Sequence, residues 1–250
     1  MTYPHYSYPP ANLFGLAGRV FFGGRRAFRA DSLACIRRLQ PPLRLLGQEH
    51  IPLAGPALIT FNHYYRPGFR AWWMALALAA VVRAEIHFIM TGELTFPGRW
   101  YAPLGQTASR LLLRRLAQVY GFTLMPPMPP RPWEVEGRAR AVRAALAYRR
   151  SHPQAILGLA PEGGDNPPDG ALAWPPPGAG RFVALLAGEY PITPVGIYES
   201  EAALCLHFGQ AYTLSLPPGL TAEQKDRLAA ESVMRAIARL LPDYLRGDFA

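Results

Sequence analysis

Residues 57–63 have the sequence Ala57-Leu58-Ile59-Thr60-Phe61-Asn62-His63, an apolar run that ends at a polar pair. The apolar part is typical of a buried β-strand. Further along the chain, residues 155–160 form a second such run and lead directly into Pro161-Glu162-Gly163. In an open α/β sheet, ligands bind beyond the carboxyl ends of the strands. We therefore expect His63 and Glu162 to line one crevice, provided that the two strands are parallel and near each other.

Strands and helices alternate from Gly47 onward. This alternation predicts an α/β fold with a mixed, largely parallel sheet flanked by helices. Thr221 and Gln224 form a capping box at the start of the last helix. Apolar spacing predicts that Leu104, Ala108, Leu111, Leu112 and Val119 form the inner face of a helix over 104–119. The expected strands are 57–61, 86–90, 122–125, 155–160, 192–198 and 204–208, with 212–216 as an optional further strand; the other expected helices are 68–83, one set by residues 135–146, one around 182–186 and one over about 221–241.

Composition limits the class of protein. A chain of 250 residues that is 50% hydrophobic and 17% charged has enough apolar residues for a sizeable core. The net charge of +9 indicates attraction to an anionic surface, either phospholipid or nucleic acid. No nucleic-acid-binding module is recognisable, so a nucleic-acid partner is not predicted. With two cysteines, the sequence excludes a disulfide framework and a cysteine-rich zinc site, and no metal is expected.

The first 46 residues form a basic segment ahead of the domain that we expect over 47–250. Residues 1–10 are predicted to be disordered, and 11–46 to be helical. Leu13, Leu16, Ala17, Val20 and Phe21 make one apolar helical stripe, and seven arginines accompany a single acid, Asp31. Such a segment can lie in a membrane interface, or its stripe can pack on the main domain.

Localisation follows from two further observations. No secretory signal is recognisable, and the longest apolar run, residues 71–82, is shorter than the roughly 20 residues that span a bilayer. The expectation is a cytoplasmic protein, peripheral on the cytoplasmic face of the membrane.

Several enzyme classes lack their signatures here. The chain has no Gly-x-Ser-x-Gly elbow, no P-loop and no His-Glu-x-x-His zinc motif. Gly178-Ala179-Gly180 follows prolines instead of a strand, so it is not a dinucleotide fingerprint.

The order of motifs resembles that of the glycerolipid acyltransferase family, which includes the lysophosphatidic acid and glycerol-3-phosphate acyltransferases. The family hallmark is Asn-His, four residues and then Asp, followed downstream by Pro-Glu-Gly. Here Asn62-His63 and Pro161-Glu162-Gly163 match, whereas Gly68 stands at the Asp position, so the first motif is degenerate. Residues 47–52, Glu93-Leu94 and the run from Gly178 to Val195 resemble further family blocks, and the resemblance covers about residues 45–215.

The resemblance implies an acyl transfer. A fatty acyl group would move from an acyl-CoA or acyl-carrier-protein thioester to a hydroxyl lipid or lipid precursor, without a metal or redox cofactor. His63 would be the catalytic base, assisted by Glu162. In the family the Asp holds the imidazole ring, which Gly68 cannot do. Four acids are candidates to replace it: Glu93, Glu162, Asp165 and Asp169. The alternative for His63 is a strand-end histidine satisfied by backbone hydrogen bonds.

The resemblance also implies a substrate-binding set. Two phosphate-binding arginines of the family are replaced here, by Asp165 and by Pro126. This favours an uncharged acceptor, unless Arg66, Arg70 or Arg131 supplies the charge. Pro67 is suited to the first turn of a helix whose free N–H groups attract an anion, although plain helix initiation is the alternative. Backbone N–H groups near 67–70 or 163–164 are candidates to stabilise an oxyanion. The predicted substrate-binding residues are Asn62, Arg66, Gly68, Pro161, Gly163, Gly164, Pro194 and Val195.

The apolar residues after the first motif allow two interpretations. Phe69, Trp72, Trp73 and Met74 either line an acyl-chain groove or form a buried core helix. For the whole chain, the leading hypothesis is an acyltransferase. The alternatives are an inactive acyl- or lipid-binding protein on the same fold and, more remotely, a basic nucleic-acid binder.

Overall fold

The fold is built on a mixed sheet. The computed structural model describes residues 3–128, 130–164 and 169–250. In this described part, the strand order is β1-β7-β6-β2-β5-β3-β4. Neighbouring strands are parallel except for β6 and β7, which form an antiparallel pair. The strands are β1 (Arg44–Leu46), β2 (Ala57–Phe61), β3 (Ile86–Thr91), β4 (Thr123–Met125), β5 (Ile156–Leu159), β6 (Ile192–Ser200) and β7 (Ala203–Phe208). The predicted α/β class with a largely parallel sheet is confirmed.

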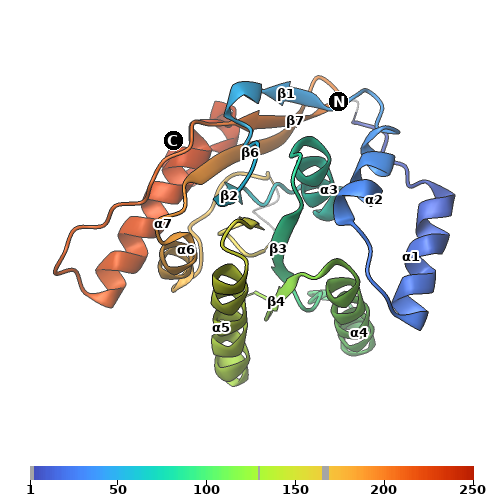
Figure 1. Ribbon diagram of the computed structural model, residues 1–250, viewed down its shortest axis with the longest axis horizontal. Helices are drawn as coiled ribbons and strands as arrows, with labels where there is room; N and C mark the ends of the chain where they lie inside the picture. Colours follow the sequence, from blue (N-terminus) through green and yellow to red (C-terminus); the bar gives the residue numbers. More distant parts are fainter. Residues whose placement is uncertain (1–2, 129, 165–168) are drawn as a thin grey trace.

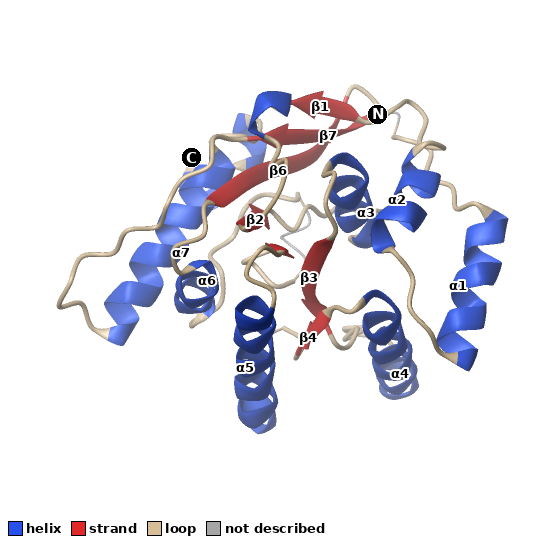
Figure 2. Cartoon of the chain, in the orientation of Figure 1, coloured by secondary structure: helices blue, strands red, loops and turns tan. Residues whose placement is uncertain are grey.

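Helices cover both faces of the sheet (Figures 1 and 2). On one side lie α2, α3 and α4, and on the other lie α5, α6 and α7, with α1 outermost beside α4. The helices are α1 (Pro10–Phe22), α2 (Phe28–Ile36), α3 (Trp72–Val81), α4 (Ala102–Tyr120), α5 (Val135–Ser151), α6 (Ala179–Ala187) and α7 (Ala222–Ala238). The optional strand at 212–216 reduces to a single bridge between Tyr212 and Ile192.

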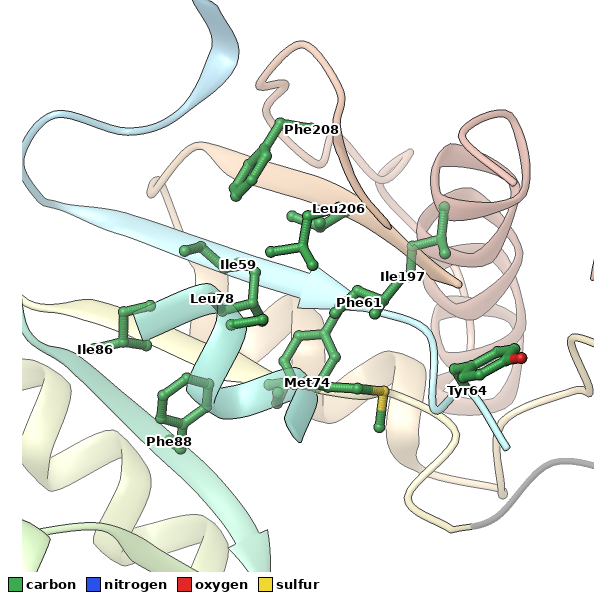
Figure 3. Close-up of a cluster of buried hydrophobic side chains, with 14 of the residues drawn as sticks. Ile59, Phe61, Tyr64, Met74, Leu78, Ile86, Phe88, Ile197, Leu206 and Phe208 are labelled. Atoms are coloured by element: carbon green, nitrogen blue, oxygen red, sulfur yellow. The ribbon is translucent and has the colours of Figure 1, made fainter. Parts of the chain in front are cut away.

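The core is centred on β2 and α3. Every residue of β2 is buried, and Phe61 points toward Met74 of α3 in Figure 3. Helix α3 is apolar on all sides, as expected for a helix enclosed by the fold. Phe69, Trp73 and Met74 are buried in this cluster, so the core interpretation is correct for these three residues. It is wrong for Trp72, which is 46% exposed at the start of α3.

The N-terminal segment is more ordered than predicted. The disorder expected before residue 10 is wrong for residues 3–10, because His5 pairs with Gln40 and the rings of Tyr6 and Tyr8 lie 4.8 Å from Trp73. Aromatic side chains supply enough buried surface to order this short segment. The helical structure predicted for 11–46 is confirmed in α1 and α2 but is wrong after Ile36. The two prolines after Gln40 cannot continue a helix, and the chain proceeds into β1.

One buried carboxylate fastens the N-terminal helices together. Asp31 of α2 accepts hydrogen bonds from Asn12 of α1 at 3.0 Å, from Tyr120 of α4 at 2.8 Å and from Arg26 at 2.7 Å. Charge-assisted bonds of this kind are stronger than neutral ones. Three helices therefore share one anchor, although α1 itself has no buried residue.

Helix α4 faces the core differently from the prediction. Leu104, Leu111 and Leu112 are exposed, and the buried positions are Ser109, Leu113, Ala117 and Val119. The helix therefore carries apolar residues on two faces. The face with the smaller residues Ser109 and Ala117 is the one that packs inward. Among the described residues, no helix combines the length and apolarity that a bilayer crossing requires.

Close helix packing explains the Gly178-Ala179-Gly180 run. A Cβ atom at Gly180 would collide with the main chain of Asp226 and Ala230 on α7. The Asp226 carboxylate also accepts bonds from the N–H groups of Gly178 and Arg181, both at 2.7 Å, which satisfies the start of α6. The run therefore serves helix contact, and the capping box of Thr221 and Gln224 at the start of α7 is confirmed.

A buried histidine connects β3 to α5. His87 forms a 2.9 Å hydrogen bond with Thr123 and stacks on Tyr148, with ring centroids 3.5 Å apart. Burial lowers the pKa of His87 from 6.5 to about 4, because the charged imidazolium is poorly solvated there.

This histidine should make stability depend on pH. As pH falls from about 6.5 to about 4, the unfolded chain binds a proton that the folded chain does not, so stability is present above this window and is lost through it. The loss should reach about 3 kcal/mol, at roughly 1.4 kcal/mol per pKa unit. Urea unfolding across this range should show a flatter pH dependence for His87→Gln than for wild type. The exposed His5→Gln variant is the control, and an unchanged slope for His87→Gln would contradict the assignment.

Candidate functional site

The site lies where β2 and β5 end side by side. The strands are parallel and directly paired, with Thr60 opposite Leu159. Both therefore leave the sheet at the same edge, where β2 leads into Asn62-His63 and β5 leads into Pro161-Glu162. The structure brings His63 and Glu162 together, as the sequence pattern predicts.

Glu162 joins three segments of the chain. Its buried carboxylate accepts a 2.6 Å hydrogen bond from the main-chain N–H of His63 and a 3.2 Å bond from the N–H of Ala173. The neighbouring Leu172 is bonded to Leu245 near the C-terminus at 2.9 Å. Glu162 therefore fixes the position of residue 63 relative to β5 and to the segment around 172.

His63 is partly exposed at this edge. Imidazole is the side chain best suited to exchange protons near neutral pH. The main-chain N–H of His63 is thus fixed, and its side chain is partly exposed. Its catalytic role stays a prediction.

The other candidate acids have different surroundings. Glu93 is bound by Arg110 and by Arg131, the latter at 2.7 Å. Burial opposes the charge of Glu93, but the hydrogen bonds from both arginines outweigh it and lower the pKa of this carboxyl. Asp169 accepts the N–H of Ala171 in a local turn, and Asp165 lies outside the described residues. Among these candidate acids, the contacts of the described residues bring Glu162 to His63, where its carboxylate accepts the main-chain N–H.

Asn62 ties β2 to β6. The residue is fully buried, its amide oxygen accepts the N–H of Ile197 at 2.7 Å, and its amide nitrogen donates to the carbonyl of Ile197 at 2.8 Å. The side chain thus imitates a backbone pair just beyond the end of the strand. These two bonds engage both the oxygen and the nitrogen of the amide. The contact of Asn62 with substrate stays a prediction.

Pro67 and Gly68 form a turn, so the predicted start of a helix at residue 68 is wrong. The N–H of Phe69 bonds to the carbonyl of Arg66 at 3.0 Å, and Gly68 has a φ of 83°. Proline followed by glycine with positive φ is the signature of a type II turn. Helix α3 begins only at Trp72, so the N–H groups of 67–70 do not form a helix N-terminus.

Sequence reasoning missed Glu199 of β6. This buried carboxylate binds Arg66, Tyr6 and Tyr64. Arg66 is therefore not the uncommitted phosphate-binding cation that the sequence suggested. An acid near the end of a mostly apolar strand was the available signal, because an acid is rarely buried without a partner.

An apolar groove adjoins the site. Its volume is about 410 Å³, and it is lined by residues at the carboxyl ends of β3 and β5 and on α5 and α6, including Met90, Met128, Val142, Leu159 and Phe182. Pro161 and Gly163, which flank Glu162, also line it. Arg131, Arg138 and Arg181 add positive charge to the wall. The groove thus approaches Glu162 from the α5 and α6 side.

The remaining predicted substrate-binding residues occupy two environments. Gly163 and Gly164 lie against Met128, which a Cβ atom would meet at 3.1 and 3.5 Å respectively. Pro194 and Val195 lie in β6, opposite Thr60 and Phe61, and Val195 is fully buried. In the described part of the chain, His, Cys, Asp and Glu do not gather in groups of three or more that could hold a metal ion.

Comparison with known proteins gives a distant structural likeness. No family model and no curated protein sequence match the chain. Among solved structures, the chain is similar to the crystal structure of the 1-acyl-sn-glycerophosphate (LPA) acyltransferase PlsC from Thermotoga maritima. The TM-score is 0.46 and the identity 15%, over 92% of this chain and 82% of that chain. A likeness of this size carries no argument about activity, which depends on the residues of the site.

The turn at Gly68 should resist restoration of the missing Asp. Gly68→Asp and Gly68→Ala should each lower the free energy of unfolding by about 1 kcal/mol, because a side chain is strained at this φ. Urea unfolding measures the change, and Gly18→Ala in α1, where φ is ordinary, is the matched control. A Gly68→Asp protein more stable than wild type would show that the turn rearranges around a carboxylate.

Proposed function

We propose that this protein transfers a fatty acyl group from an acyl-CoA or acyl-carrier-protein thioester to a hydroxyl acceptor, a lipid or lipid precursor. The observation that carries the proposal is the joining of His63 and Glu162 at adjacent strand ends beside an apolar groove. The sequence resemblance to glycerolipid acyltransferases suggests the reaction, an acyl transfer with His63 as the base.

The chemistry requires one base and no cofactor. His63 takes the proton of the acceptor hydroxyl as the oxygen attacks the thioester carbonyl. The tetrahedral intermediate then collapses, the carbon–sulfur bond breaks, and the thiolate leaves with the proton from the imidazolium. Glu162 acts through the main chain of residue 63, since its carboxylate accepts that N–H.

The groove suits the acyl chain. Its methionines and aliphatic side chains offer an apolar wall of adaptable shape. A substrate chain lying there would bring its thioester toward Pro161 and Gly163, next to Glu162.

The charge of the acceptor depends on which arginines near the site are uncommitted. Arg66 is paired with Glu199, and Arg131 with Glu93, so neither is uncommitted. Arg138 donates to the carbonyl of Pro127 at 3.0 Å, which places a guanidinium beside Pro126, where the family has an arginine. An uncharged hydroxyl acceptor remains the proposal, with Arg138 and Arg181 as the cations to test against a phosphorylated one.

A second candidate is an inactive acyl- or lipid-binding protein on the same fold. Gly68 favours it, because this position forms a turn and offers no carboxylate to hold the imidazole ring. Asn62 favours it as well, since its amide oxygen and nitrogen are both bonded to Ile197 of β6. The groove would then hold a chain without reaction.

We also propose that an anionic membrane surface is a partner. On α1, Phe14, Phe21 and Phe22 are 79%, 78% and 92% exposed. The exposed leucines of α4 lie on the helix that contacts α1, and Arg114 and Arg115 of that helix are also exposed. Exposed aromatic residues among arginines fit the interface of an anionic bilayer.

Thioester turnover tests the transfer. With palmitoyl-CoA and a panel of hydroxyl lipids, we expect acceptor-dependent CoA release that falls at least about 100-fold in His63→Ala, since a general base contributes about that much or more. His152→Ala, at an exposed site, should match wild type. Release that does not depend on an acceptor would mean thioester hydrolysis and would contradict the transfer. No release from a folded protein that binds a fluorescent fatty acid would favour the binding candidate.

Vesicle flotation tests the membrane surface. Wild type should float with phosphatidylglycerol-containing vesicles and less with pure phosphatidylcholine. Phe21→Ser with Phe22→Ser should reduce binding at least about tenfold, because burying each ring is worth about 1.5–3 kcal/mol. Leu53→Ser, 75% exposed elsewhere, is the control. Wild type that stays unbound would refute this part of the proposal.

A further inference from the structure

We infer that Glu199 is a positioning residue for the site, which holds the segment after His63 together with a strap formed by residues 3–8. This inference rests on the proposed function in taking His63 as the base. Glu199 itself touches no reacting atom in this scheme, and it acts through Tyr64 and Arg66.

The Glu199 carboxylate is the centre of a buried polar cluster. Its side chain is 4% exposed. It accepts bonds from Arg66, whose Nη2 lies 2.8 Å from Oε1 and whose Nε also donates. It also accepts bonds from the hydroxyl groups of Tyr6 at 2.6 Å and Tyr64 at 3.3 Å. Two residues of the His63 segment and one of the strap thus converge on a single acid.

The cluster completes a set of ties around His63. Asn62 is bonded to Ile197 of β6, and Tyr64 and Arg66 are bonded to Glu199, two residues further along the same strand. Glu162 of the β5 exit holds the N–H of residue 63 itself. The segment is therefore held by side chains before and after the proposed base, and by the main-chain N–H at the base itself. Figure 3 shows Tyr64 directly beyond the end of β2.

The strap encloses the cluster. The ring of Tyr3 lies 3.7 Å from the guanidinium carbon of Arg66, and Tyr6 contacts the rings of Phe69 and Trp73 with centroids 5.8 and 4.8 Å away. Burial and the bond to Glu199 raise the pKa of Tyr6, so its hydroxyl stays protonated and remains a donor. Excluding water strengthens the charged bonds inside.

This arrangement explains how the chain can position a base without the motif Asp. In the family pattern, the Asp holds the imidazole ring, whereas here Gly68 forms a turn. Instead, the side chains of residues on both sides of the histidine are bonded to β6, and the histidine itself is held by its main-chain N–H. Loss of the Glu199 charge would leave the partly buried Arg66 without its counter-charge and should release the segment, because removing one partner of a largely buried ion pair is strongly unfavourable.

The test compares Glu199→Gln with Glu201→Gln. Glu201 lies just beyond the same strand and is 77% exposed, in a surface pair with Arg44. We expect Glu199→Gln to speed amide hydrogen exchange at residues 62–70 at least tenfold and to leave exchange in β5 and β7 unchanged. In the transfer assay, kcat should fall at least tenfold while KM for palmitoyl-CoA changes less than threefold. Glu201→Gln should behave as wild type in each measurement.

Other outcomes overturn the inference. Faster exchange throughout the sheet would show a purely structural role, and unchanged exchange at 62–70 would show that Glu199 does not hold this segment. If Glu199→Gln fails to fold, Tyr6→Phe provides the same test with a milder change, and at least threefold faster exchange at 62–70 is expected. If wild type shows no transfer at all, the proposed function fails, but the exchange measurement still decides whether Glu199 holds the segment.

Discussion

The hydrogen bond from the His63 main chain to Glu162 joins the ends of the two central strands. It forms because β2 and β5 are parallel neighbours whose next residues leave the sheet at the same edge. The rest of the site depends on this contact: the segment around Ala173 binds the other oxygen of the same carboxylate, and the groove begins at the residues that flank it. A fold with antiparallel central strands would send these two residues to opposite edges.

Acidic side chains have a structural role that the net charge conceals. Asp31, Glu93, Glu162 and Glu199 are all buried, and each binds several donors. Three of these acids pair with Arg26, Arg66 and Arg131, which are themselves largely buried, so these pairs add little to the surface charge. The other, exposed arginines are available to attract an anionic surface, whereas the buried acids hold the loops and helices in place.

Local patterns predicted much of this structure from sequence. Apolar runs located β2, β3, β5, β6 and β7, and the capping residues located the start of α7. The errors have physical causes. The sequence Pro67-Gly68 is compatible with a helix start, and only the positive φ of the glycine identifies a turn. Helix α4 has apolar residues on two faces, and its sequence does not indicate which face is buried.

Sequence patterns could not predict which side chains become partners in the folded structure. Glu199 meets Arg66 only because β6 pairs with β2, and no spacing within either strand encodes that neighbourhood. The same holds for Asp31, whose donors come from three separate parts of the chain. The candidate base and its neighbouring acid were predictable because each directly follows a strand, whereas the groups that hold them depend on tertiary structure.

The packing of both ends of the chain has a practical consequence for protein engineering. Residues 3–8 cover Arg66, and the C-terminal turn around Leu245 and Phe249 packs beside Leu172, next to the segment that bonds to Glu162. A purification tag or fluorescent fusion joined directly at either end would therefore press on segments that touch the site. A flexible spacer, or an insertion in the exposed loop at Pro217–Gly219, would keep such an attachment away from it.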